Sequence, residues 1–140
     1  MNPHQHTTTI QADPNKLWAL CANPALWSRW DPEVQEATLE GSMRIGATGQ
    51  LTTVKGQRFP FRVLVCDPSQ TLLLSHPLSV GVDLLLKLHW EGNPAGIQLT
   101  GEIQLVGPMA ALKYRMSKVQ LLQRLEQRVH GLRRELESYR

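Results

Sequence analysis

The C-terminal segment of this chain constrains its fold most, because it has the periodicity of one long amphipathic helix. Apolar residues recur at intervals of three and four from Leu112 to Leu136, which places them on one helical face. A helix from Pro108 to about Ser138 would be roughly 45 Å long, which exceeds the width of a small sheet. Its apolar face must be buried against another element. The rest of the chain must therefore supply a large apolar surface.

The segment from Glu33 to Val106 supplies that surface, because its patterns are those of about six strands. Residues 97–105 alternate between apolar and polar side chains, as in an antiparallel sheet with one buried face. Apolar residues also alternate along 59–65 and 82–90,. Asp-Pro and glycine-rich turns separate these stretches, so we expect successive strands to be antiparallel neighbours.

The N-terminal region predicts one more strand and two short helices. Residues 5–11 have β-branched character,. Asp13 is a suitable N-cap for a helix that begins at Pro14 and ends before Pro24,. A second helix covers about 24–29, and Asp31-Pro32 stops it. We interpret the tryptophans of this stretch as a structural corner, and whether Trp27 or Trp30 also closes a pocket stays open.

These elements predict an α+β fold of one domain, residues 1–140, in which a curved antiparallel sheet of about seven strands grips the long helix. A cavity remains where the helix does not fill the concave side. Gly131 interrupts the helix at a cost of about 1 kcal/mol relative to alanine. It therefore marks either a kink or a close contact.

Composition and motifs exclude several classes of protein. The two cysteines lie at positions 21 and 66, far from CxxC spacing, so we expect no disulfide and a cytoplasmic location. No secretion signal and no membrane-spanning run is apparent. The chain also lacks the common nucleotide, zinc-protease, calcium and serine-hydrolase motifs,. We expect no cofactor and no metal.

Charge is concentrated in the C-terminal segment. Residues 108–140 contain eight basic and three acidic residues, a net charge of +5, whereas the whole chain carries +3. We interpret this as a solvated helix face and expect no nucleic-acid binding, because no aromatic residues are interleaved with the charges. A protein-interaction role for the basic helix stays an alternative. A sheet edge or the helix end beyond Gly131 could also serve a homodimer.

The chain resembles the START-like (SRPBCC) helix-grip superfamily, and within it the polyketide cyclase/dehydrase-like group. The resemblance spans about residues 7–137 and rests on the stretches IQADPNKLWALCANPALWSRWDPEV, LEGSMRIGATGQL, FRVLVCDPSQTLLL and GIQLTGEIQLVGP, followed by the amphipathic helix. It implies a seven-stranded sheet around a long C-terminal helix, with an apolar ligand held between them. It implies no particular activity, because the superfamily includes carriers, receptors and cyclases.

Candidate ligand-binding residues follow from the apolar faces of the predicted strands and helix. Methionine suits such a site because its side chain is adaptable. The candidates are Phe61, Val63, Leu86, Leu88, Trp90, Leu99 and Ile103 from the sheet and Met109, Leu112, Met116 and Val119 from the helix.

Histidines are the candidates for acid–base chemistry. His76 has the same parity as Leu72 and Leu74 and could point into the cavity, where it could act as a general acid. His4 and His6 have metal-ligand spacing, but we expect their terminus to be loose. The leading hypothesis is a binding or carrier protein for a hydrophobic small molecule such as a lipid, polyketide or isoprenoid. The alternative is a cyclase or dehydratase that uses His76.

Overall fold

A computed structural model describes residues 4–138, in which seven antiparallel strands form one sheet in the order β1-β7-β6-β5-β4-β3-β2. Every pair of strands joined in sequence from β2 to β7 is a neighbouring pair, as the short turns predict,. The elements are β1 (His4–Ile10), α1 (Pro14–Ala22), the 3₁₀ helix η1 (Pro24–Arg29), β2 (Val34–Leu39), β3 (Thr48–Thr53), β4 (Arg58–Asp67), β5 (Thr71–Ser79), β6 (Val82–Asn93), β7 (Gly96–Val106) and α2 (Ala110–Glu137).

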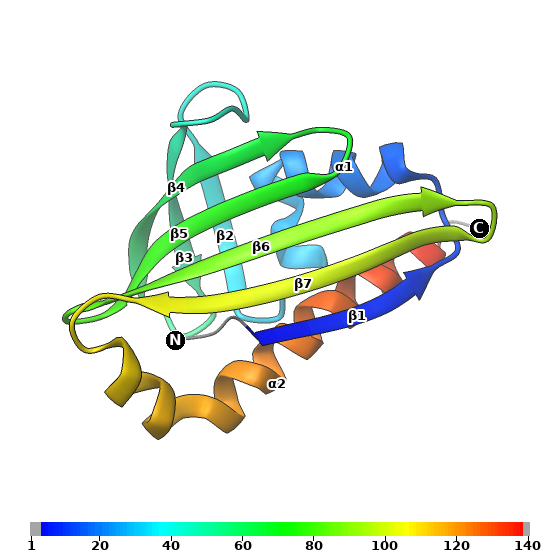
Figure 1. The fold of residues 1–140 in the computed structure, drawn as a ribbon. Coiled ribbons are helices and arrows are strands. Elements are labelled where there is room, and N and C mark those ends of the chain that lie inside the picture. The colour runs from blue at the N-terminus through cyan, green and yellow to red at the C-terminus, as the bar shows by residue number, and fades with distance from the viewer. Residues whose placement is uncertain (1–3, 139–140) are drawn as a thin grey trace.

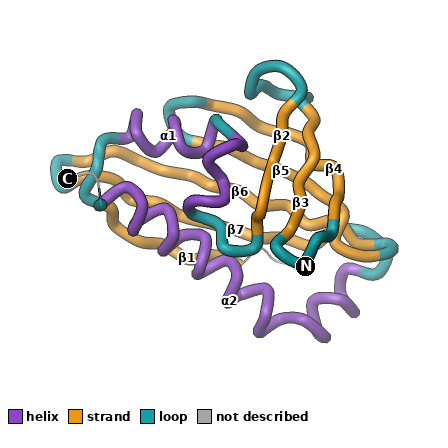
Figure 2. Tube along the Cα trace, turned by 180° about the vertical axis from the view of Figure 1, so that it is seen from behind, coloured by secondary structure: helices purple, strands orange, loops and turns teal. Residues whose placement is uncertain are grey.

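The helices lie together against one face of the curved sheet. Figure 2 shows α1, η1 and α2 on the same side of the strands, and Figure 1 shows α2 running alongside β1 and β7. This arrangement confirms the predicted helix-grip fold. The short helices begin as their sequences predict, because the side chains of Asp13 and Asn23 accept hydrogen bonds from the backbone N–H groups of Asn15 and Ala25,.

The second half of α2 packs tightly onto the sheet. Leu125, Val129 and Leu132 are almost completely buried. Gly101 of β7 permits this approach, because a Cβ atom there would lie 2.6 Å from Val129 Cγ2. Gly131 plays the same part toward η1, since a Cβ atom there would lie 1.9 Å from the Trp30 carbonyl oxygen. Of the two roles predicted for Gly131, the structure shows the close contact.

The first half of α2 extends beyond the sheet, as Figure 1 shows for its first turns beside the β5–β6 turn. Helix α2 has 28 residues, which makes it about 42 Å long. The sheet is too narrow to cover that length. Four apolar side chains that were expected to face the cavity are therefore exposed instead. They are Met109, Leu112, Met116 and Val119, with exposed fractions of 44%, 45%, 75% and 70%.

A bulge in β4 makes the predicted apolar face of this strand, residues 59–65, shorter than expected. The register with β5 shifts between Val63 and Val65, which reverses the alternation beyond that point. Val63 is buried as expected, whereas Val65 is 38% exposed. The apolar face of β4 thus ends at Val63.

Candidate functional site

A cavity of about 330 Å³ lies between the sheet, the end of η1 and the middle of α2. This volume is at the lower end of the range for small-molecule pockets, about 300–1,000 Å³. Apolar and charged side chains both line it. The lining residues are Trp27, Trp30, Asp31, Glu33, Val34, Leu51, Thr53, Lys55, Gln57, Phe59, Phe61, Leu74, His76, Pro77, Leu78, Leu84, Leu86, Lys113, Gln120, Leu121, Arg124 and Arg128.

Aromatic and leucine side chains form the apolar wall. The rings of Trp27 and Phe61 lie 5.0 Å apart, and those of Trp27 and Trp30 lie 6.3 Å apart in an edge-on arrangement. Leu74 and Leu86 face the cavity from adjacent strands, where they are paired in register. This wall can bury an apolar molecule, since burial stabilises by about 25 cal/mol per Å² of apolar surface.

A buried ion pair forms the polar end of the cavity. Arg128 Nε donates a hydrogen bond to Asp31 Oδ2 at 2.9 Å, and the side chains are only 11% and 7% exposed. The other oxygen of Asp31 accepts a hydrogen bond from the Glu33 backbone N–H at 3.0 Å. These contacts fix Asp31 directly after η1 and hold the turn against α2. Removing either partner would leave a buried charge uncompensated.

The cavity carries an excess of positive charge. Four basic residues and two acidic residues line it. Arg124 Nε lies 3.5 Å from Glu33 Oε1, and Arg128 pairs with Asp31. Among the described residues, no ion pair joins Lys55 or Lys113 to an acidic partner. These two lysines can therefore attract an anionic group on a bound molecule.

His76 lies at the edge of the cavity, stacked on Phe59 with the ring centroids 4.8 Å apart. Its Nδ1 lies 2.9 Å from the Pro77 carbonyl oxygen. That oxygen only accepts hydrogen bonds, so Nδ1 carries the proton and Nε2 has a free lone pair. Burial lowers the pKa of His76, and the positive charge of Arg128 lowers it further, against the opposing effects of the Pro77 contact and Asp31. His76 is thus a neutral base at physiological pH.

The two tryptophans of the η1 stretch differ in their polar groups. The Trp27 indole N–H donates to the Cys21 carbonyl oxygen at 2.9 Å. The buried Trp30 indole N–H has no hydrogen-bond partner among the described residues. A buried donor without a partner costs about 1–3 kcal/mol. An oxygen atom of a ligand within reach of Trp30 could satisfy it.

The predicted ligand-binding residues fall into three groups. Phe61 and Leu86 line the cavity, as does His76, the candidate for acid–base chemistry. The exposed helix residues described above do not line it, and α2 instead presents polar residues such as Lys113 and Gln120 to the cavity. The remaining five are buried in the core and do not line the cavity. They are Val63, Leu88, Trp90, Leu99 and Ile103.

Sequence reasoning left open whether Trp27 or Trp30 closes the pocket, and both line the cavity. It missed the Asp31–Arg128 pair. One signal for the pair was present, because Arg128 continues the spacing of Leu121, Leu125 and Leu132 on the buried face of α2. A charged residue at a buried position requires a partner. Two arginines of α2 that line the cavity, Arg124 and Arg128, each form an ion pair within the fold.

Neither cysteine forms a disulfide among the described residues. Burial raises the pKa of the Cys21 thiol to about 12, and it also raises the pKa of Cys66. Both thiols are therefore protonated at neutral pH. Among the described residues, none of the helices has the length and apolar character needed to cross a membrane.

Comparisons with known proteins extend the structural result. Residues 4–137 match the family described as "Polyketide cyclase / dehydrase and lipid transport". No curated protein matches the chain.

Several solved structures share the fold. DynU16, from the dynemicin biosynthetic locus, has a TM-score of 0.77 at 20% identity, with 100% of this chain and 49% of that chain covered. The di-domain ARO/CYC StfQ, from the steffimycin pathway, has a TM-score of 0.79 at 9% identity, covering 98% of this chain and 51% of that chain. Ara h 8.0201 has a TM-score of 0.72 at 14% identity, covering 98% of both chains. This chain thus spans about half the length of the first two.

Proposed function

The chain belongs to the polyketide cyclase / dehydrase and lipid transport family, and from this premise we propose that it binds a hydrophobic molecule with a polar, acidic end. The apolar body would lie against Trp27, Phe61 and Leu86. The acidic end would lie toward the cationic side chains of the cavity. Lipids and polyketide-derived acids both have this chemistry.

One observation carries the proposal: an aromatic and aliphatic cavity contains a fixed ion pair and two further lysines. Binding pockets are typically apolar with a few placed polar groups that fix the orientation of the ligand. Here Asp31 and Arg128 hold each other in place. Lys55 and Lys113 supply the positive charge that attracts a carboxylate.

A displacement experiment tests the acidic end. An apolar fluorescent probe would be displaced by a long-chain carboxylic acid and by the alcohol of the same chain length. We expect the acid to bind at least about tenfold more tightly, which corresponds to about 1.4 kcal/mol. Equal affinities, or tighter binding of the alcohol, would contradict the proposed polarity.

Matched lysine variants locate the source of that preference. The double variant Lys55→Gln/Lys113→Gln should abolish the preference for the acid. Lys87→Gln should not, because Lys87 is out of phase with the cavity-lining Leu84 and Leu86 of β6,. If the double variant and Lys87→Gln lost the preference for the acid equally, the net charge of the protein, and not the cavity, would attract the acid.

A catalytic role is a second candidate, and the position of His76 favours it. His76 Nε2 is an available base beside the cavity, and its lowered pKa keeps it unprotonated,. Such a base could remove a proton from the carbon next to a ketone, the first step of an aldol-type cyclisation. The protein would hold the ketone against the apolar wall. His76 would accept the proton and return it in a later step.

Proton exchange on a simple ketone tests this role. An aryl methyl ketone in D₂O would exchange its methyl protons faster with the protein present, as followed by NMR. His76→Gln should remove the acceleration without changing the melting temperature. His89→Gln is the matched control, since the His89 side chain is hydrogen-bonded to that of Thr71 and does not line the cavity. No acceleration by the native protein would exclude His76 as a base for this chemistry.

A further inference from the structure

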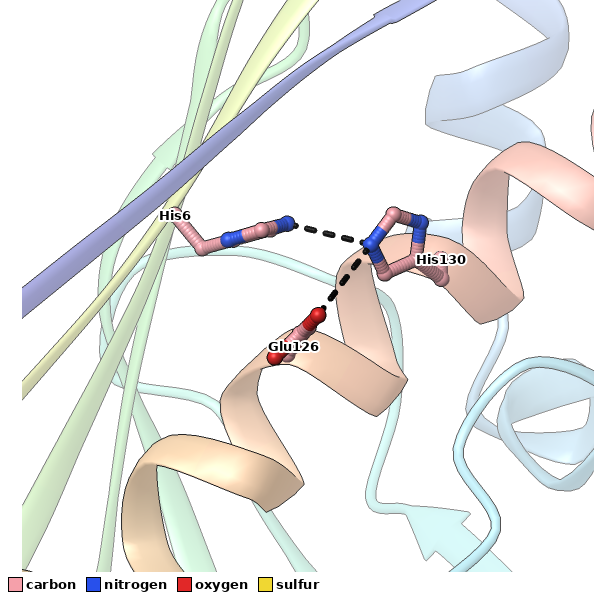
Figure 3. Close-up of side chains that lie close together, drawn as sticks. All are labelled: His6, Glu126 and His130. Atoms are coloured by element: carbon pink, nitrogen blue, oxygen red, sulfur yellow. Dashed lines mark hydrogen bonds and ion pairs between the residues drawn. The ribbon is translucent and has the colours of Figure 1, made fainter. Parts of the chain in front are cut away.

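A second cluster of functional side chains lies outside the cavity, where the first strand meets the last helix. His6 projects from β1, and Glu126 and His130 project from successive turns of α2 (Figure 3). The spacing of Glu126 and His130, four residues apart, places them on the same helical face. Pairing of β1 with β7 puts His6 opposite Gly101 and fixes the strand beneath the helix. The expectation of a loose terminus around His6 is therefore wrong.

The distances between the three side chains suit a metal ion. His6 Nε2 lies 3.2 Å from His130 Nε2, and His130 Nε2 lies 3.7 Å from Glu126 Oε1. One ligand atom from each residue lies within 4.8 Å of the others. Two nitrogen ligands at about 2.05 Å from a tetrahedral Zn²⁺ ion lie about 3.3 Å apart. The two imidazoles already have this separation.

The ligand set indicates which class of ion would bind. Two imidazoles and one carboxylate suit first-row transition metals such as Zn²⁺, whereas Ca²⁺ and Mg²⁺ prefer oxygen ligands only. His130 and Glu126 are 46% and 57% exposed, so water can reach the remaining coordination positions. They border an open groove that also includes Gln123, Gln127 and Arg134. The positive charge of Arg134 would weaken cation binding without blocking the site.

We propose that His6, Glu126 and His130 form a site for a divalent transition-metal ion such as Zn²⁺, which links β1 to α2. An ion held by both elements would bind the folded state better than the unfolded chain. Metal binding would therefore stabilise the fold by mass action. The proposal is independent of ligand binding in the cavity, because none of the three residues lines it.

Titration with Zn²⁺ tests the site in the full-length protein. Calorimetry should show one ion bound per chain, and the melting temperature should rise with Zn²⁺ concentration. His6→Gln, Glu126→Gln and His130→Gln should each weaken binding by at least about tenfold, because even the loss of a residue that only orients a ligand costs about 10–100-fold. Titration with Co²⁺ adds a direct signal, because coordinated imidazole changes its visible absorption spectrum. Absence of one-to-one binding by the native protein would overturn the proposal.

His4 provides the decisive control. His4 and His6 are two residues apart, so these two histidines alone could bind a metal ion. In the structure, however, the His4 ring is stacked on Tyr114 with the centroids 4.6 Å apart. His4→Gln should retain Zn²⁺ binding. If His4→Gln lost binding while Glu126→Gln and His130→Gln kept it, the terminal histidine pair would be the site and the proposal would be wrong. Circular dichroism of each variant would separate loss of a ligand from loss of the fold.

Discussion

Arg128 and Asp31 join the last helix of the chain to the turn after η1 through a 2.9 Å hydrogen bond between Nε and Oδ2. Both side chains are also part of the cavity wall. The contact that holds α2 in position therefore also fixes the polar end of the proposed binding site. We therefore expect stability and ligand binding to be coupled through this one pair.

Breaking the pair should destabilise the protein strongly. Arg128→Met leaves the Asp31 carboxylate buried without its partner, and we expect a loss of about 3 kcal/mol in the free energy of unfolding. Urea unfolding measures this loss. The double variant Arg128→Met/Asp31→Asn should recover part of it, because the uncompensated charge is then gone. If the loss in the double variant equalled the sum of the losses in Arg128→Met and Asp31→Asn, the two residues would not be coupled.

Gly131 should not tolerate even a methyl group. A Cβ atom at this position would lie 1.9 Å from the Trp30 carbonyl oxygen, so Gly131→Ala must move α2 away from η1. We expect a loss of about 1–3 kcal/mol, as for other overpacked sites. Lys118→Ala, at an exposed position of the same helix, should be neutral or slightly stabilising. A stabilised Gly131→Ala variant would contradict the observed contact.

The two halves of α2 should respond differently to truncation of apolar side chains. Leu125 is 1% exposed, whereas Met116 is 75% exposed. We expect Leu125→Ala to cost about 2–5 kcal/mol and Met116→Ala to change stability by less than about 0.5 kcal/mol. Thermal or urea unfolding compares the two. A large loss for Met116→Ala would mean that the first half of α2 is buried in solution.

His76 should make stability dependent on pH in the mildly acidic range. Its pKa in the folded state lies below the ordinary value of 6.5, so the unfolded chain takes up a proton first as the pH falls. The unfolded state then binds more protons, and the free energy of unfolding decreases from pH 6.5 down to the folded-state pKa. Urea unfolding at several pH values should show this decrease, with a smaller slope in His76→Gln. If the free energy of unfolding of His76→Gln fell with pH as steeply as that of the native protein, other groups would cause the pH dependence.

The overall fold could be predicted from the sequence because its signals are local and periodic. The alternation along 97–105 shows which face of β7 is buried, and the three- and four-residue spacing of apolar residues does the same for α2,. The β4 bulge after Val63 could not be predicted, since it depends on pairing with β5 rather than on the residues of β4 alone,.

The cavity could be predicted only in part, because its position depends on where the long helix leaves the sheet. Phe61, Leu86 and His76 were identified from strand parity, which is a local property. The apolar stripe of α2 continues unchanged from the buried half into the exposed half. Periodicity shows that a face is apolar, but it does not show how far the partner sheet extends beneath it.

The most direct test of the binding proposal fills the cavity without changing its charges. Leu86→Trp would occupy the space beside Phe61 and Leu74, whereas Leu85→Trp places the same side chain on the opposite face of β6,. Calorimetric titration with a long-chain carboxylic acid should show one-to-one binding by the native protein and by Leu85→Trp, and at least about tenfold weaker binding by Leu86→Trp. Equal binding by all three proteins, or none by the native protein, would contradict a binding site in this cavity.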